Sequence, residues 1–297
     1  MKKILKNFYT LIPAKKVIFS FIKIFWTPPH SVYKHLYFNG IFNVRIPGTK
    51  GFKLMHHSTE IENDIFWQGL TEGWEKRSMK LWIQLCRTSK VILDIGANTG
   101  IYSLTANAVN ESATIYAFEP LHRIYQKLKR NNELNHFHIV CIEKALSDRE
   151  GQQVIYENDG PHVNAATLNQ YTAEKYGKGL LNKRTVISTT TLDNFIETEN
   201  LPKVDLIKLD VETHEPQVIE GYKQYIKLHK PAFLIEVLSD DVGEKLQELF
   251  DPLEYFYFNI DDKNDCIRRV DGIRKSDYFN YLICPGETAD NIKATLS

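Results

Sequence analysis

The sequence lacks several features that mark large classes of proteins. Its four cysteines are scattered without a C-x-x-C pair, which argues against a cysteine zinc site and for a reducing compartment. Basic and acidic residues both number 37, so no bulk positive charge favours nucleic acid as a partner. We therefore expect a cytoplasmic protein without a nucleic-acid partner.

A long hydrophobic run is also missing, although the amino-terminal segment comes near to one. The apolar run 17–26 is too short to cross a bilayer and contains Lys23, and no small-residue cleavage pattern follows it. A narrow polar stripe at helical spacing interrupts the apolar surface, formed by Lys16, Ser20, Lys23 and Thr27. Such a helix is expected to bury most of its surface. It packs either on this protein or a second copy, as a dimer contact, or it lies peripherally in a membrane surface with its lysines near anionic headgroups.

Two regions with different patterns follow. Gly and Pro punctuate short β-leaning runs within 37–57, which predicts a small hairpin, and 69–87 is typical of a helix. After Lys90 strand-like and helical runs alternate, which predicts an α/β fold with a doubly wound, mostly parallel sheet. Within it, 138–146 is typical of a third strand and 216–230 of a helix, and the β-leaning runs 152–158 and 184–192 flank a polar segment. The last strand-like runs, 254–260 and 278–285, have no helix between them and predict an antiparallel carboxyl-terminal edge. We predict an amino-terminal helical and β extension over 1–88 and a ligand-binding domain over 89–297.

The segment DIGANTG, residues 94–100, follows the first strand of the alternating region. In such sheets ligands bind beyond the carboxyl ends of the strands, where Gly96 and Gly100 permit a sharp turn and close backbone approach. The spacing is not the G-x-G-x-x-G of dinucleotide sites, and Asp94 places a negative charge where a pyrophosphate would lie. A ligand with an amine and a sulfonium suits the turn better. S-adenosylmethionine has both, together with a carboxylate for the turn amides.

A second carboxylate, Glu119, lies at the end of the next strand-like run, and Pro120 follows it. A carboxylate at this place accepts hydrogen bonds from ribose hydroxyls, as an acidic residue does in NAD sites, so it does not by itself choose the cofactor. Pro120 would end the strand and shape the adenine side. Taken singly, Asp94 is typical of a helix cap and Glu119 of an exposed strand end. Together at the ends of adjacent strands they favour a ligand site.

Titratable residues also crowd the segment KLDVETHEP, residues 208–216. The strand should end near Asp210, at the rim of the same crevice, with Glu212 and His214 close behind. Crowded carboxylates raise one another's pKa values, which suits a general base near neutrality, and His214 is able to serve as that base alone. The alternative is a helix-capping cluster in which Glu215 favours the helix dipole. We predict a catalytic role for Asp210 and leave both interpretations open for Glu212 and His214.

On these segments the chain resembles the FkbM family of S-adenosylmethionine-dependent methyltransferases. The matching segments are WE at 74–75, DIGANTG at 94–100, FEP at 118–120, ALSD at 145–148, TTLDNF at 190–195, DLIKLDVETHE at 205–215 and LIE at 234–236. They lie in order within 74–236, a little more than half of the chain, and the combination is more specific than any one piece. The resemblance implies a class I methyltransferase, Rossmann-like fold and methyl transfer to oxygen, often on a sugar or a secondary-metabolite hydroxyl.

The resemblance also implies roles for individual residues. The methionine portion of the cofactor would be held by Asp94, Gly96, Asn98 and Gly100, the ribose by Glu119, and the adenine by a segment that includes Ala145, Ser147 and Asp148. Asp210 would lie between cofactor and acceptor, and Glu75 would reach the site from the preceding helix. The family usually has Gly where this chain has Thr213. Because Thr does not easily adopt a positive φ, this departure puts the roles of Glu212 and His214 in doubt.

We therefore predict an S-adenosylmethionine-dependent O-methyltransferase acting on a sugar, glycan or secondary-metabolite hydroxyl. One alternative is a catalytically silent, cofactor-binding scaffold protein. Another is an NAD-dependent oxidoreductase, which the missing G-x-G-x-x-G disfavours. No metal is expected, because His136 and His138 share one side of a strand but no evident carboxylate completes a site. The polar segment 158–183 is either a loop that contacts the acceptor or a solvated surface loop.

Overall fold

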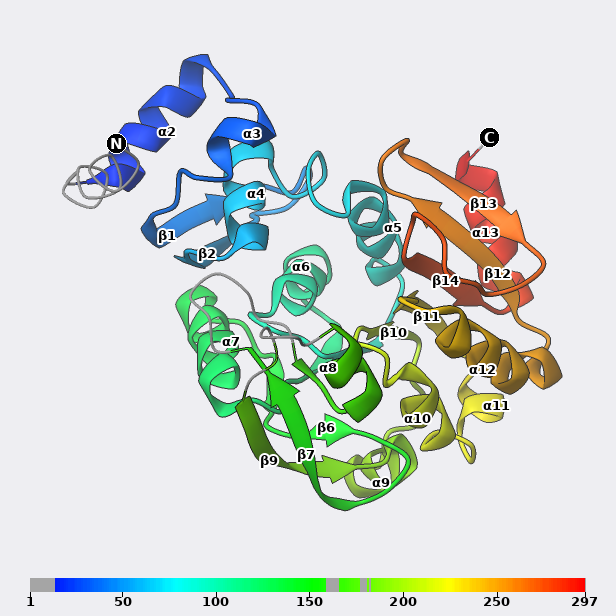
Figure 1. The fold of residues 1–297 in the computed structure, drawn as a ribbon. Coiled ribbons are helices and arrows are strands. Elements are labelled where there is room, and N and C mark those ends of the chain that lie inside the picture. The colour runs from blue at the N-terminus through cyan, green and yellow to red at the C-terminus, as the bar shows by residue number, and fades with distance from the viewer. Residues whose placement is uncertain (1–13, 159–165, 177–180, 182, 297) are drawn as a thin grey trace.

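The computed structural model describes residues 14–158, 166–176, 181 and 183–296, so parts of the polar segment 158–183 lie outside it. Figure 1 shows an α/β body built on a central sheet, with a smaller amino-terminal part of helices and a hairpin beside it. The central sheet has eight described strands in the order β13-β12-β14-β11-β10-β3-β4-β5. The chain runs outward from β3 to β5 and then returns to β10 on the other side of β3. Strand order therefore reverses between β3 and β10, which is where ligands bind in such sheets.

Five strands of this sheet are parallel and three form an antiparallel edge. The parallel strands are β3 (Val91–Ile95), β4 (Thr114–Phe118), β5 (Val140–Ile142), β10 (Leu206–Leu209) and β11 (Ala232–Glu236). The edge comprises β12 (Phe256–Asp261), β13 (Cys266–Val270) and β14 (Asn280–Cys284). β14 lies between β11 and β12 and is antiparallel to both. The predicted mostly parallel, doubly wound sheet with an antiparallel carboxyl-terminal edge is confirmed.

Helices cover both faces of this sheet (Figure 1). They are α5 (Lys76–Cys86), α6 (Ile101–Val109), α7 (His122–Asn135), α9 (Leu192–Glu199), α10 (Glu215–Glu220), α11 (Ile226–His229), α12 (Asp240–Phe250) and α13 (Gly286–Leu296), with a 3₁₀ turn at Asp251–Leu253. Alternate residues of one strand enter different cores: Ile92 of β3 packs with the amino-terminal part, whereas Leu93 packs with α9, α10 and α12. Both faces are buried, which explains why the parallel strands appear in the sequence as continuous apolar runs.

Two predicted elements are divided in the structure. The expected helix 216–230 forms two helices instead, α10 and α11, which a turn at 221–225 separates. Gly221, at the start of this turn, lies so close to Ser147 that an added Cβ would be 2.1 Å from the Ser147 carbonyl oxygen. The expected third strand 138–146 becomes β5 and the two-residue β6 (Ala145–Leu146). β6 belongs to a second sheet, so the chain crosses between sheets at this point.

This second sheet has the order β6-β9-β7-β8, with β7 (Gly151–Glu157), β8 (Ala166–Thr167) and β9 (Lys183–Thr190). β7 and β9 pair antiparallel, as the two β-leaning runs in this region suggested. Helix α8 (Gln170–Tyr176) lies beside it in Figure 1.

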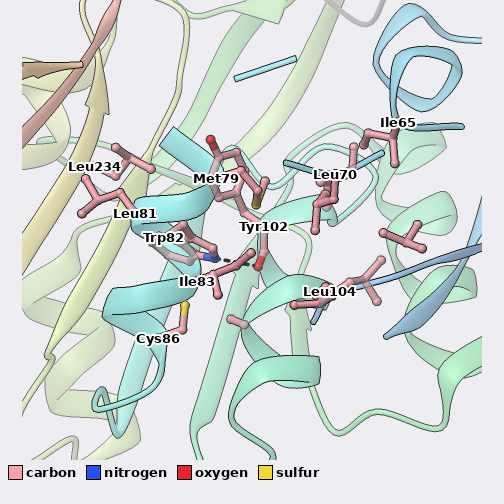
Figure 2. Packing of buried hydrophobic residues seen from close by; sticks show 14 of the residues in the cluster. Ile65, Leu70, Met79, Leu81, Trp82, Ile83, Cys86, Tyr102, Leu104 and Leu234 are labelled. Carbon is pink, nitrogen blue, oxygen red and sulfur yellow. Dashed lines mark hydrogen bonds between the residues drawn. The ribbon is translucent and has the colours of Figure 1, made fainter. Parts of the chain in front are cut away.

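The amino-terminal part contains α2 (Lys15–Phe25), α3 (His30–Tyr33), the antiparallel hairpin of β1 (Asn39–Val44) and β2 (Phe52–His57), and α4 (Glu60–Gln68). The predicted hairpin is confirmed. Figure 2 shows how this part joins the body: Ile65 and Leu70 lie on one side of a core that also includes Met79, Trp82 and Leu104. The Trp82 indole Nε1 donates a hydrogen bond of 3.0 Å to the carbonyl oxygen of Tyr102, which ties α5 to α6.

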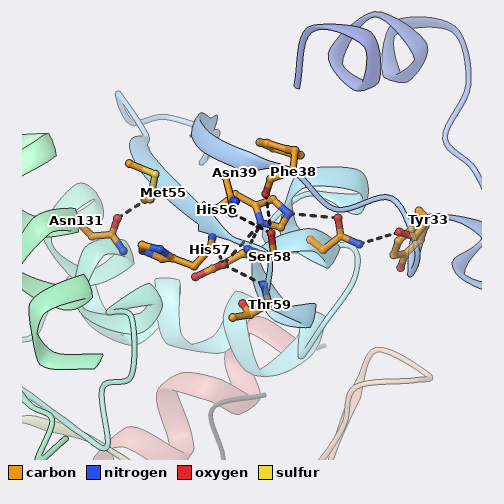
Figure 3. A network of polar contacts seen from close by, with 11 residues as sticks. Tyr33, Phe38, Asn39, Met55, His56, His57, Ser58, Thr59 and Asn131 are labelled. Atoms are coloured by element: carbon orange, nitrogen blue, oxygen red, sulfur yellow. Dashed lines mark hydrogen bonds and ion pairs between the residues drawn. The ribbon is translucent and has the colours of Figure 1, made fainter. Parts of the chain in front are cut away.

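A polar network fixes the corner between β2 and α4 (Figure 3). The buried Glu62 carboxylate accepts hydrogen bonds from the backbone N–H groups of His57 (2.6 Å) and Thr59 (3.4 Å), which forms a capping box at the start of α4. Asn131 of α7 accepts a hydrogen bond of 3.1 Å from the backbone N–H of Met55. The first turn of α4 is therefore held in a defined position against the body.

The amino-terminal helix differs from its prediction. Phe19 is the only side chain of α2 that is buried, so most of the helix surface stays uncovered by the residues that the structure describes. Within the polar stripe, Lys23 contacts the body by donating a hydrogen bond to the carbonyl oxygen of Phe66, whereas Lys16, Ser20 and Thr27 are exposed. Among the described residues no helix combines the length and the apolar composition needed to cross a membrane.

Candidate active site

A cavity of about 310 Å³ opens beyond the carboxyl ends of four neighbouring parallel strands. Each of these strands contributes an acidic residue at or near its end: Asp94 from β3, Glu119 from β4, Asp210 from β10 and Glu236 from β11. The cavity thus lies at the reversal of strand order, and its volume is in the range of sites for small molecules and cofactors.

The glycine turn after β3 forms one wall. Gly96 has a φ of 81°, and a Cβ there would lie 1.8 Å from the carbonyl oxygen of Asp210, so only glycine fits between β3 and β10. Asn98 has a φ of 50°, a conformation that Asn tolerates better than most residues. Its backbone N–H donates a hydrogen bond of 3.1 Å to Glu119 Oε2. The turn therefore aims one of its amides at the carboxylate of the next strand.

Glu119 is almost completely buried at the end of β4. Its second oxygen, Oε1, accepts a hydrogen bond of 2.9 Å from the backbone N–H of Leu121. Burial raises the pKa of Glu119 to about 7, although both backbone N–H bonds oppose the shift. The carboxyl group is thus fixed in orientation and titrates near neutrality.

Asp94 is both a helix cap and a cavity residue, the two interpretations that the sequence allowed. Its side chain lines the cavity, and its Oδ2 also accepts hydrogen bonds from the backbone N–H (2.8 Å) and the hydroxyl of Ser103 in α6. Burial raises the pKa of Asp94 to about 6, and the bonds from Ser103 and the charge on Lys208 oppose the shift.

The other end of the cavity holds a buried lysine among carboxyl groups. The Lys208 Nζ lies 3.2 Å from Asp210 Oδ2 and 5.0 Å from the ring centroid of Tyr102. Burial lowers the pKa of Lys208, but the charges of Asp210, Glu75 and Glu236 outweigh it and raise the pKa above its usual value. Lys208 is therefore a permanent cation inside the cavity.

Glu212 lines the same end of the cavity. Burial and the nearby charge on Asp210 raise its pKa to about 7, and Lys208 opposes the shift. Burial also raises the pKa of Glu75, whose carboxylate accepts a hydrogen bond from the Tyr102 hydroxyl. The charge on Lys208 lowers the pKa of Glu75 and that on Asp210 raises it, so Glu75 interacts with the charged groups at this end of the cavity.

The loop after β10 has an unusual backbone. Glu212 and Thr213 have φ values of 55° and 76°, so Thr213 adopts the left-handed conformation at the position where the family usually has Gly. Glu215 Oε1 supports the loop by accepting hydrogen bonds from the backbone N–H groups of Val211 (3.0 Å) and Thr213 (3.3 Å). Thr167 adds a hydrogen bond of 2.6 Å to the carbonyl oxygen of Glu212. The loop geometry is thus kept without glycine, at the cost of backbone strain.

The structure brings most of the predicted site residues to the cavity. The lining includes Glu75, Asp94, Gly96, Asn98, Glu119, Pro120, Ala145, Asp210 and Glu212. Gly100, Ser147, Asp148 and His214 lie outside it. The roles of both groups in binding or catalysis remain predictions. For the four residues outside the lining, no direct contact with the cavity supports the predicted role.

His214 is the clearest departure from the sequence-based hypothesis. Its Nε2 lies 3.0 Å from the hydroxyl oxygen of Ser147, and burial lowers its pKa to about 4. The imidazole is 7% exposed and joins the β10 loop to the second sheet. This position argues for a structural role and against His214 as the general base.

Several residues of the lining had no role predicted from the sequence. Among them are Lys208, Glu236, Trp74, Tyr102, the α4 N-cap Thr59, and Glu60 and Ile61 of the first turn of α4. Lys208 and Glu236 had a sequence signal, because a charge within or directly at the end of a buried strand requires a partner. The T-x-x-E pattern at Thr59 marks a helix start, but nothing in the sequence places this helix beside the cavity.

The fold and the carboxylate-lined cavity at its switch point define a class I, Rossmann-like methyltransferase fold. The family model described as Methyltransferase FkbM domain matches residues 94–260, which is more than half of the chain. The chain belongs to the FkbM methyltransferase family.

Individual relatives share moderate similarity with the chain. The hexuronic acid methyltransferase AglP of Haloferax volcanii is 24% identical over 161 residues, 52% of this chain and 62% of the relative. The 31-O-demethyl-FK506 methyltransferase FkbM of Streptomyces tacrolimicus is 26% identical, over 46% of this chain and 60% of the relative. The matches thus span about three-fifths of these curated relatives. A crystal structure of an FkbM methyltransferase from Methylobacillus flagellatus KT is similar, with 15% identity, a TM-score of 0.42, and coverage of 67% of this chain and 44% of that one.

Proposed function

We propose that the protein transfers a methyl group from S-adenosylmethionine to a hydroxyl oxygen of a sugar, glycan or secondary metabolite. The observation that carries the proposal is the convergence of Asp94, Glu119 and Asp210 from three adjacent strands on one cavity, with Gly96 at its wall. The bound cofactor supplies an activated methyl group. The residues of the chain hold it, position the acceptor and receive the proton.

The residues at the β3 and β4 ends fit this cofactor. A carboxylate offers about four acceptor positions, so Glu119 can accept ribose hydroxyls in addition to its two backbone N–H bonds. Asp94 presents a negative charge for the amine of the methionine portion. The cradle at Gly96, which a Cβ would fill, allows the close backbone approach that this portion requires.

The residues at the β10 and β11 ends supply the acceptor chemistry. We infer that Glu212 receives the proton of the acceptor hydroxyl, because a base is most effective when its pKa is near the working pH and that of Glu212 is about 7. Asp210, paired with Lys208, would orient the hydroxyl. Orientation of the two reactants supplies a large part of the rate enhancement in such displacements.

The charged groups at the β10 and β11 ends also indicate which net charge an acceptor should carry. Four carboxyl groups, those of Glu75, Asp210, Glu212 and Glu236, act on one another and on the ammonium of Lys208, whereas the second lysine of the lining, Lys144, follows β5 and precedes Ala145. An anionic acceptor would add another negative charge to this cluster, whereas hydroxyls can donate to the carboxylates. We therefore propose a neutral, hydroxyl-rich acceptor.

Calorimetric titration with S-adenosylhomocysteine and, separately, with NAD tests the cofactor assignment. Micromolar binding of the first, lost in Glu119→Ala, is expected, and binding of NAD alone would overturn the methyltransferase proposal. Methyl transfer from labelled S-adenosylmethionine is then measured over neutral saccharides and their uronic-acid counterparts.

On an accepted substrate, Glu212→Gln should lower kcat by about 10²-fold or more, the usual contribution of a general base. Glu244→Gln, at an exposed position of α12, should leave kcat unchanged. Full activity of Glu212→Gln contradicts its assignment, and cofactor binding without turnover across the whole panel favours the scaffold alternative.

A further inference from the structure

The exposed side of α2 is a continuous apolar stripe. Its members follow the spacing i, i+1, i+4, i+7 and i+8: Val17, Ile18, Phe21, Ile24 and Phe25. Ile24 is 71% and Phe25 75% exposed, and the rings of Phe21 and Phe25 lie 5.3 Å apart. Single apolar side chains on a surface are ordinary, whereas a contiguous stripe of this kind marks a contact surface.

The contacts of α2 with the body fix this orientation. Phe19 packs on Trp67, with ring centroids 5.7 Å apart, and Lys23 binds the carbonyl oxygen of Phe66 and lies 5.2 Å from the centre of its ring. Phe19 and Lys23 are thus turned toward α4, and the apolar stripe is turned away. Figure 1 shows α2 at the outer end of the amino-terminal part, far from the central sheet.

The charge of the surrounding sequence indicates what covers the stripe. The first 59 residues contain ten basic residues and no acidic residue: Lys2, Lys3, Lys6, Lys15, Lys16, Lys23, Lys34, Arg45, Lys50 and Lys53. Because the whole chain is formally neutral, the remaining residues carry a net charge of −10. The apolar stripe therefore belongs to the one strongly cationic segment of a polarised chain.

We propose that α2 docks in the surface of an anionic lipid membrane. The stripe would enter the boundary between headgroups and acyl chains, and the surrounding basic residues would lie near lipid phosphates. A second copy of the chain is the less suitable occupant, because a contact between two α2 stripes brings two segments of ten positive charges together.

Helix α4 contacts both the proposed docking helix α2 and the cavity. Helix α4 holds α2 through Phe66 and Trp67 near its end, and its first turn places Glu60 and Ile61 in the cavity lining. The membrane proposal does not depend on methyl transfer, and its test measures neither turnover nor an acceptor.

Vesicle flotation of the full-length protein tests the proposal. Vesicles of phosphatidylcholine with about 30% phosphatidylglycerol are compared with phosphatidylcholine alone. Wild-type protein should float with the anionic vesicles, float much less with the neutral ones, and be released by high salt. Ile24→Glu should lower the partition coefficient at least about tenfold, because it removes a large apolar side chain and adds a negative charge.

Leu228→Glu is the matched control, since Leu228 is 73% exposed but lies on α11, away from α2 in Figure 1. It should float like the wild type. Unchanged circular dichroism and S-adenosylhomocysteine affinity would show that Ile24→Glu is folded. The proposal is overturned if wild-type protein does not bind anionic vesicles or if Ile24→Glu binds equally well. It is also overturned if sedimentation velocity shows a wild-type dimer that Ile24→Glu dissociates without vesicle binding.

Discussion

The titration of Glu119 makes cofactor affinity depend on pH. Burial raises the pKa of this carboxyl group to about 7 in the free protein, so about half of the molecules carry it protonated at neutral pH. Both of its oxygens already accept backbone N–H bonds, and only the ionised form retains full acceptor capacity for two ribose hydroxyls. S-adenosylhomocysteine should therefore bind more tightly as the pH rises.

The size of this pH effect follows from the fraction of molecules in which Glu119 is ionised and therefore able to bind the ribose. For a group with a pKa of about 7, the ionised fraction is about 0.1 at pH 6 and about 0.9 at pH 8, and the apparent Kd varies inversely with this fraction. The Kd should fall about tenfold across this interval, which corresponds to about 1.4 kcal/mol.

Calorimetry at constant ionic strength provides the measurement, with three proteins compared. Glu119→Gln removes the main titrating group and should bind more weakly, with only the change of about twofold that Asp94, whose pKa is about 6, contributes over this interval. Glu212→Gln removes a group whose pKa is also about 7 but which we place at the acceptor end, so it should keep the wild-type slope. A flat wild-type profile, or a change in Kd as steep in Glu119→Gln as in the wild type, would refute the assignment of Glu119 to the ribose.

Three further predictions concern two loops beside the cavity and the carboxyl group that supports one of them. Thr213→Gly should be more stable toward urea than Thr213→Ala by about 1 kcal/mol, because Ala keeps the strained φ of 76° and Gly does not; equal stability would show that the loop relaxes. Gly96→Ala should lose S-adenosylhomocysteine binding and more stability than Gly48→Ala. The two positions have similar φ values, 81° and 76°, but a Cβ at Gly96 meets the Asp210 carbonyl oxygen whereas no described atom lies within 4 Å of one at Gly48. Burial raises the pKa of Glu215 to about 8, above its unfolded value, so this group stabilises the fold at low pH and the contribution is lost as the pH rises toward 8. Between about pH 5 and pH 8 the melting temperature of wild-type protein should therefore fall more than that of Glu215→Gln. Identical pH profiles of the two proteins would contradict the raised pKa of Glu215.

The central sheet was predictable because its physical causes are local. Parallel strands covered on both faces must be apolar throughout, and the alternation with helices then sets the topology. The break between α10 and α11 was not predictable, because the apolar residues keep their helical spacing from Val218 to Ile226 across it. β13 was missed for a different reason: its sequence CIRRV lies half-exposed at the edge and carries no clear alternation.

The same distinction applies to the candidate site. Asp94, Glu119 and Asp210 were predictable because strand ends in a parallel sheet meet at one edge. The position of His214 was not, since a loop residue two positions away from Glu212 can face either the cavity or the second sheet. The contact of Lys23 in α2 with the body was missed because amphipathic patterns identify two faces of a helix but not which one meets the protein.

Lys208 explains how so many carboxyl groups share one cavity. An unpaired buried ammonium would be very costly, and closely spaced buried carboxylates would remain protonated, so each kind of group depends on the other. The charge on Lys208 lowers the pKa of Glu212 beyond β10 and that of Asp94 beside the glycine turn. A single strand residue thus influences the protonation of both ends of the cavity. This coupling is a physical reason for a lysine within an otherwise apolar strand, where packing alone would favour a hydrophobic side chain.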